Sequence, residues 1–312
     1  MTLCFILASV PIMEDLLYKR SFDLIRGIKP YHTPELTKIM NVLSTLGEGK
    51  AYFYTCFIFY LSGHEYEFTY LIGTYFTTQY WICWLKTQIR ASRPQFDEPS
   101  LGVENESQQC SGEFGNPSGH ALLVTMFIPT CLHLAQVRQA AWFQRHKFLA
   151  WIIKIVAYIF IFLVCFCRLY LGRHGLDSVL LGCEIGFLSA HFWQHCFKKN
   201  FFDPIFCPSP SEDPKVVAAR SKSAAIYAWV IYLLVFIKIV ILYEYVEHSS
   251  VIPQQWWDSI IKTCPVWKKL NTFHYSTMVH TGYLVMLPSL YLWNYLKHRE
   301  WAKTGVPPLE RH

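Results

Sequence analysis

Residues 67–94 read EFTYLIGTYFTTQYWICWLKTQIRASRP, an apolar run that ends in a cluster of basic residues. A helix that crosses the hydrocarbon core of a bilayer needs about 20 mostly apolar residues. Residues 67–85 supply this length, and Lys86, Arg90 and Arg93 follow directly after them. The stretch therefore predicts a transmembrane helix with positive charge concentrated at one end.

The composition of the whole chain also indicates a membrane protein. Only 16% of the 312 residues are charged, against about 25% in an average soluble chain. The 53% of apolar residues excludes a disordered chain, and a net charge of +6 is too modest for a nucleic-acid binder with a basic surface. The eleven cysteines are scattered and include no CxxC pair, so we expect neither zinc nor another cofactor.

Further apolar runs predict an all-α bundle of about six to seven transmembrane helices. The predicted spans are residues 67–85, 119–135, 148–167, 178–197, 224–243 and 277–296, with a seventh formed by Ala51–Leu61 extended back through Ile39–Leu46. We interpret residues 1–50 as an N-terminal interfacial segment, in which Pro30 and Pro34 interrupt the helices. Residues 51–197 are the predicted catalytic transmembrane core, and residues 198–312 the C-terminal transmembrane helices with a polar tail.

The distribution of basic residues among the loops predicts the orientation. Loops 136–147 and 198–222 and the tail 297–312 carry more Lys and Arg than the loops on the opposite side, so the positive-inside rule makes them cytoplasmic. The N-glycosylation sequon that begins at Asn105 lies in an opposite, lumenal loop. We expect an integral protein of the endoplasmic reticulum or another endomembrane with a lumenal site; the mitochondrial inner membrane stays open as an alternative.

Three polar clusters fall at helix ends on that lumenal side. The first is KTQIRASRP from Lys86, the second is PSGH at Pro117–His120, and the third is RLYLGRHGLD at Arg168–Asp177. Ionisable residues are costly near a membrane, and by default they mark functional sites. We therefore predict one polar site near one membrane face.

The residue types in these clusters suit phosphoryl transfer without a metal. Arg guanidinium groups and a Lys ammonium match a phosphate dianion, and a Ser-Gly pair at a helix N-terminus adds an anion site. Two histidines can serve as acid and nucleophile, and an aspartate can orient one imidazole. The predicted substrate ligands are Lys86, Arg93, Ser118, Gly119 and Arg168, and the predicted catalytic residues are His174, His120 and Asp177.

In residues 67–197 the sequence resembles the type 2 phosphatidic acid phosphatase superfamily. KTQIRASRP is similar to its K-x6-RP element, PSGH matches its second element, and CRLYLGRHGLD is similar to SR-x5-H-x3-D. The third motif departs twice: Cys167 stands where Ser is usual, and Asp177 follows His174 by three positions instead of four.

The resemblance implies roles for individual residues. His174 would attack phosphorus to form a phosphohistidine, while His120 would protonate the leaving alkoxide and then activate water. Lys86, Arg93 and Arg168 would bind the phosphate oxygens, Ser118 and Gly119 would add hydrogen bonds, and Asp177 would orient His174.

Several functions remain open at this level. The motifs resemble those of sphingoid-base phosphate phosphatases, which favours a lipid phosphate, and a glucose-6-phosphatase-like sugar phosphatase is the alternative. A non-catalytic subunit of a larger membrane complex is a second class, and a transporter would need ionisable residues within the spans. The expected partners are membrane lipids and a phosphate-bearing lipid or sugar, with no nucleic acid.

Overall fold

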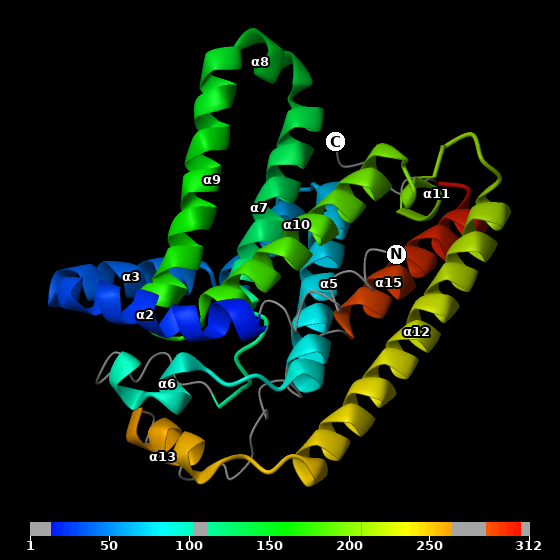
Figure 1. Cartoon of the computed structure of the whole chain (residues 1–312). Coiled ribbons are helices and arrows are strands. Elements are labelled where there is room, and N and C mark those ends of the chain that lie inside the picture. Colours follow the sequence, from blue (N-terminus) through cyan, green and yellow to red (C-terminus); the bar gives the residue numbers. More distant parts are fainter. Residues whose placement is uncertain (1–13, 103–111, 207, 264–284, 307–312) are drawn as a thin grey trace.

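The computed structural model describes residues 14–102, 112–206, 208–263 and 285–306, and within these ranges every regular element is a helix. The prediction of an all-α architecture is thus confirmed (Figure 1). The helices are η1 (Glu14–Tyr18), α2 (Lys19–Ile28), η2 (Lys29–Tyr31), α3 (Pro34–Leu46), α4 (Gly49–Leu61), α5 (Glu65–Ile89), α6 (Pro94–Asp97), η3 (Pro99–Leu101), α7 (Gly119–Arg138), α8 (Ala140–Arg145), α9 (Lys147–Tyr170), α10 (Leu176–Lys198), α11 (Asp203–Phe206), α12 (Pro214–Ser249), α13 (Gln254–Thr263) and α15 (Met286–Thr304).

The closest helix pair in the centre of the fold is α7 and α10. Two glycines one turn apart on α10, Gly182 and Gly186, face α7: a Cβ on Gly182 would lie 2.7 Å from the Ser118 carbonyl oxygen, and one on Gly186 would lie 1.9 Å from Thr125 Oγ1. Small residues at this spacing let two helix backbones approach each other in a membrane. The spacing thereby holds the PSGH segment against the start of α10.

Three described helices are long and apolar enough to cross a membrane: α7, α9 and α12. The predicted spans within α5 and α10 are also long helices, but they are more polar. The polar groups of α5 are satisfied inside the protein, since the hydroxyls of Thr74 and Thr78 donate to the carbonyls one turn earlier, at 2.6 and 2.9 Å. Burial among other helices explains why α5 tolerates them.

The span predicted over residues 39–61 was wrong, because the structure divides it into two helices. Helix α3 ends at Leu46, and α4 begins at Gly49. Glycine disfavours helix continuation, and Gly47 sits where a Cβ would come within 2.6 Å of Val164 Cγ1. At about 1.5 Å per residue, the 13 residues of α4 span only about 20 Å, too short for a bilayer core.

The N-terminal helices lie across the lower ends of α9 and α10 in Figure 1. Ser21 of α2 accepts a hydrogen bond from the backbone N–H of Leu176, at 2.7 Å, and so caps the first turn of α10. Tyr18 donates to Asp97, and Arg26 pairs with Glu98. These contacts fasten the N-terminal segment onto the loops between the spanning helices.

The C-terminal part consists chiefly of α12 with α15 alongside it (Figure 1). Helix α15 covers only the second part of the predicted span 277–296, and the first part lies outside the described residues. The Asn105 sequon also lies outside them. Helix α13 packs near α6, where Trp256 Nε1 donates to Asp97 Oδ1 at 2.9 Å.

Candidate active site

The three polar clusters meet at one end of the helix bundle. Helices α5 and α9 end there, and α7 and α10 begin there. Backbone hydrogen bonds join the segments: Gly115 N–H donates to Ala91 at 2.8 Å, and Ser118 N–H donates to Ser178 at 2.9 Å. The predicted site residues are therefore brought together from distant parts of the sequence.

Two cations of the first cluster surround Glu113. The ammonium of Lys86 forms a buried ion pair with the Glu113 carboxylate. The guanidinium of Arg93 donates from Nε to the backbone carbonyl of Glu113, at 2.8 Å, and from Nη1 to that of Arg173, at 3.1 Å. A protein carboxylate thus occupies part of a site whose cations suit an anion.

Arg168 is held by the N-terminal helices. Its Nη1 donates to the hydroxyl of Ser44 on α3. The turn that follows α3 lies against the second cluster, because a Cβ on Gly47 would be 3.2 Å from His120 Cδ2. The segment between α3 and α4 therefore forms one wall of the site.

Two polar atoms of the PSGH segment are buried and unsatisfied. Among the described residues, neither the Ser118 hydroxyl nor Nε2 of His120 has a hydrogen-bond partner. Ser118 is the N-cap residue of α7, but its side chain makes no capping hydrogen bond. Unsatisfied buried polar groups are costly, and they are expected where a ligand supplies the missing partner.

The imidazole of His174 is fixed at both nitrogens. Nδ1 lies 2.8 Å from the Gly115 carbonyl oxygen and 3.2 Å from the Ser178 hydroxyl, and Nε2 lies 3.3 Å from Nη1 of Arg93. A carbonyl oxygen accepts only, so Nδ1 carries the proton and Nε2 presents a lone pair beside a cation. This is the tautomer that a nucleophilic Nε2 requires.

Asp177 lies in the site region, next to the segment that precedes α7. Its Oδ2 accepts from Asn116 Nδ2 at 3.4 Å, and its Oδ1 lies close to Gly175. Gly119, the remaining predicted ligand, faces Ile82 at ordinary contact distance.

The polar residues of the site are deeply buried. Lys86, Arg93, Ser118, Arg168 and His174 are each at most 5% exposed. Burial lowers the pKa of Arg93 to about 9 despite the attraction of Glu113, and Arg168 and Arg173 lower it further. The guanidinium still carries its charge at neutral pH.

The same surroundings act on His174. Its pKa lies well below the usual 6.5 because the ring is buried and because Arg93, Arg168, Lys86 and His120 repel a further positive charge. The ring is neutral at physiological pH and can act as a nucleophile.

Sequence reasoning missed four residues of this site. Glu113, Ser44, Arg173 and Ser178 lie in it, and only Arg173 and Ser178 had a signal, their position beside His174 and Asp177. As for metals, no group of three or more His, Cys, Asp or Glu side chains in the described ranges is placed to hold an ion.

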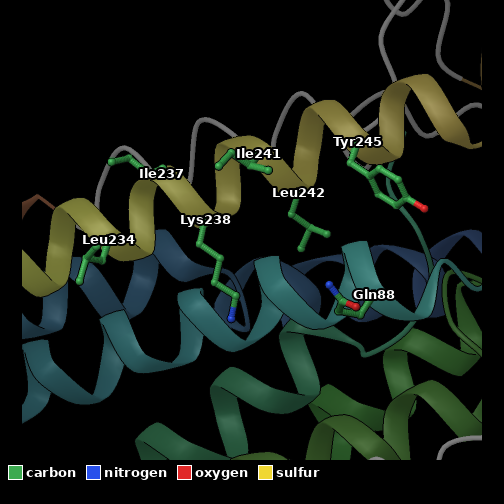
Figure 2. A pocket seen from close by; sticks show the side chains of 7 residues that line it. All are labelled: Gln88, Leu234, Ile237, Lys238, Ile241, Leu242 and Tyr245. Carbon is green, nitrogen blue, oxygen red and sulfur yellow. The ribbon is translucent and has the colours of Figure 1, made fainter.

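A separate groove of about 490 Å³ runs between α5 and α12 (Figure 2). Its lining residues are Gln88, Leu234, Ile237, Lys238, Ile241, Leu242 and Tyr245. Lys238 extends to the aromatic surface of α5, with Nζ 3.4 Å from the Tyr80 hydroxyl and 4.9 Å above the Trp84 ring. None of the predicted site residues lines this groove, so it is distinct from the cationic site.

The fold and the site together define a class: a membrane helical protein with a buried cationic site and two histidines. Residues 67–202 match the sequence model of the PAP2 superfamily, a range that contains all three motifs. This segment is therefore similar to the PAP2 superfamily, as the motifs predicted. The match supports a membrane phosphatase as the general class of the protein.

Comparison with known proteins adds two findings. The crystal structure of a transmembrane PAP2-type phosphatidylglycerolphosphate phosphatase from Bacillus subtilis is similar at a TM-score of 0.49 and 20% identity, over 64% of this chain and 94% of that one. No curated protein matches the chain.

Proposed function

We propose that the protein hydrolyses a phosphomonoester through a phosphohistidine, without a metal ion. The observation that carries the proposal is the His174 imidazole, whose Nε2 lone pair faces Arg93 among buried cations. Phosphoryl transfer depends mainly on positioning and on neutralising the charge of the phosphoryl oxygens. Residues of this kind can supply both.

In the proposed first step, Nε2 of His174 attacks phosphorus and the ester P–O bond breaks. His120 gives its proton to the departing alkoxide. In the second step, water attacks phosphorus, His120 accepts the water proton, and the P–N bond breaks to release inorganic phosphate. Lys86, Arg93 and Arg168 would neutralise the phosphoryl oxygens, and the Ser118 hydroxyl would donate the hydrogen bond that it lacks among the described residues.

The substrate that we propose is a lipid phosphate. The site lies where spanning helices end, and α2 and α3 contact this end through Ser21 and Ser44. The same two helices expose Leu24, Ile39 and Val42. Exposed apolar side chains on short helices at this level suit contact with a bilayer surface. A lipid headgroup could reach the site from the membrane, whereas a sugar phosphate would arrive from water.

The decisive experiment uses the purified full-length protein in mixed micelles with EDTA present. Release of inorganic phosphate is measured from a sphingoid-base phosphate, phosphatidic acid and glucose 6-phosphate. We expect release from a lipid substrate and its loss in His174→Ala. Release from none of the three refutes the enzyme, and activity that survives His174→Ala refutes the phosphohistidine route.

A matched control checks that loss of activity is specific to the site. His298 on α15 is also buried and hydrogen-bonded, with Nδ1 2.7 Å from the Ser221 hydroxyl, but it lies outside the three motifs. We expect His298→Ala to release inorganic phosphate as the wild type does. After a quench without acid, ³²P from the substrate should remain bound to the wild type and to His298→Ala. It should not remain bound to His174→Ala.

We further propose that the site faces the lumen of an endomembrane. The support is the excess of basic residues in the opposite loops and the sequon at Asn105. Changing Asn105 to Gln should increase gel mobility as glycosidase treatment of the wild type does. Unchanged mobility in both tests removes this support.

A further inference from the structure

The hydrogen bonds around His174 identify its orienting groups. Nδ1 approaches two oxygen atoms, the Gly115 carbonyl at 2.8 Å and the Ser178 hydroxyl at 3.2 Å. The Ser178 hydroxyl in turn donates to the Gly175 carbonyl, at 3.2 Å, so its lone pairs are available to accept from Nδ1–H. One N–H is thus shared between two neutral acceptors.

The position of Ser178 in the chain explains this arrangement. Ser178 is the fourth residue after His174, and it lies in the first turn of α10, whose start is capped by Ser21. Asp177, one residue earlier, is rotated by about 100° around the helix and accepts from Asn116. The hydroxyl of Ser178 is the side-chain oxygen placed 3.2 Å from Nδ1 of the ring.

We propose that Ser178, together with the Gly115 carbonyl, positions His174 in the way that a carboxylate does in a catalytic triad. The inference rests on the proposed function for the role of His174 as nucleophile. The two acceptors fix the Nδ1–H tautomer and the direction of Nε2. Unlike a carboxylate, they add no negative charge, so they do not favour the imidazolium form.

The charges around the ring make this difference measurable. The charged and titratable groups near the ring are Lys86 of α5, Arg93 after α5, Glu113 before α7, His120 of α7, Arg168 of α9, Arg173 of the loop, and Asp177 of α10. Cations dominate this set, and together with burial they keep the pKa of His174 below its usual value. A carboxylate placed at Ser178 would oppose them.

Four variants of the full-length protein test the proposal: Ser178→Ala, Ser178→Thr, Ser178→Asp and Asp177→Asn. Ser178→Ala should lower kcat about three- to tenfold, the effect of one neutral hydrogen bond, with little change in KM. Ser178→Thr, which keeps the hydroxyl, should recover most of this loss. Ser178→Asp should move the acid limb of kcat/KM upward by about one pH unit or more, and Asp177→Asn should move that limb by a smaller amount.

A second readout does not depend on turnover. Long-range ¹H–¹⁵N NMR of histidine-labelled protein in detergent reports the tautomer and the pKa of His174, with His174→Gln used to assign its signals. We expect the Nδ1–H tautomer in wild type, a mixture of tautomers in Ser178→Ala, and a raised pKa in Ser178→Asp.

Two results would overturn the proposal. One is an acid limb and His174 pKa that shift in Asp177→Asn but not in Ser178→Asp, which makes Asp177 the partner. The other is a Ser178→Ala protein whose His174 tautomer is unchanged, which makes Ser178 a packing residue. If the wild type shows no phosphatase activity, the proposed function fails, while the NMR arms still decide the positioning of the ring.

Discussion

Replacing Glu113 with Gln tests whether a protein carboxylate occupies the place of a phosphate oxygen. In the structure its carboxylate pairs with the buried ammonium of Lys86, and its backbone carbonyl accepts from Arg93. A bound phosphate that uses Lys86 must take over this ammonium from the carboxylate. The amide side chain of the Glu113→Gln variant has nearly the same shape, but it carries no charge that competes with phosphate.

The expected gain in phosphate affinity follows from the free energy of the Lys86–Glu113 contact that phosphate would replace. A hydrogen bond to a charged group contributes about 1.5–3 kcal/mol, and each 1.4 kcal/mol corresponds to tenfold in affinity. Removing the competing charge should therefore tighten phosphate binding by about 10- to 100-fold. The unliganded variant should also lose stability, because Lys86 then remains buried without its anionic partner.

The assay is a titration of the purified protein with inorganic phosphate, followed by calorimetry and by the shift in Tm. Glu65→Gln is the matched control, since Glu65 pairs with Lys297 at 2.6 Å at the opposite end of α5. We expect a lower Tm without phosphate and a larger phosphate-induced rise only in Glu113→Gln. Equal or weaker phosphate affinity in that variant refutes the competition, and equal effects in both variants indicate a general charge effect.

Three further predictions concern neighbouring parts of the site. Gly47→Ala should lower kcat about ten- to 100-fold, because the added Cβ would displace Val164 and His120. Gly27→Ala is the control: its added Cβ would meet no atom within 4 Å, so this variant should retain wild-type kcat. Ser44→Ala removes an acceptor from Arg168 and should raise KM about tenfold or more, with recovery in Ser44→Thr; an unchanged KM contradicts the contact. Because the pKa of His174 is lowered below 6.5, its neutral form prevails above 6.5 and is lost as the pH falls through the lowered pKa. The acid limb of kcat/KM should therefore have its midpoint below 6.5 once the substrate's own ionisation is taken into account, and a midpoint above 6.5 would contradict the assignment.

Hydrophobic patterning was sufficient to predict most of the helices around the site. The apolar runs 67–85, 119–135, 148–167 and 178–197 each fall within one helix, α5, α7, α9 and α10 respectively. Long apolar periodic segments are the strongest signal in a sequence. Because adjacent spans alternate in direction, the three polar clusters could also be predicted to meet at one end.

The division between α3 and α4 could not be predicted from hydropathy. Both flanking runs are apolar, and their sum has the length of a span. The break depends on Gly47, which packs against Val164, a residue more than one hundred positions later in the chain. A tertiary contact of this kind is invisible in a local window.

The partners within the site were also beyond sequence reasoning. Ser44 and Glu113 are ordinary polar residues in the sequence, and their roles arise only when Arg168 and Lys86 are placed beside them. Asp177 shows the opposite difficulty. The motif drew attention to the carboxylate, whereas the structure places the hydroxyl of the neighbouring Ser178 3.2 Å from the imidazole.

The cap that Ser21 places on α10 bears on how changes in this protein are interpreted. Ser21 lies outside the PAP2 segment, residues 67–202, and is 155 positions away from Leu176, to which it is bonded. Ser44, which holds Arg168, also lies outside that segment. A map of important positions drawn from the PAP2 segment alone would class substitutions at these two serines as remote, although each serine hydrogen-bonds directly to the polar cluster Arg168–Asp177.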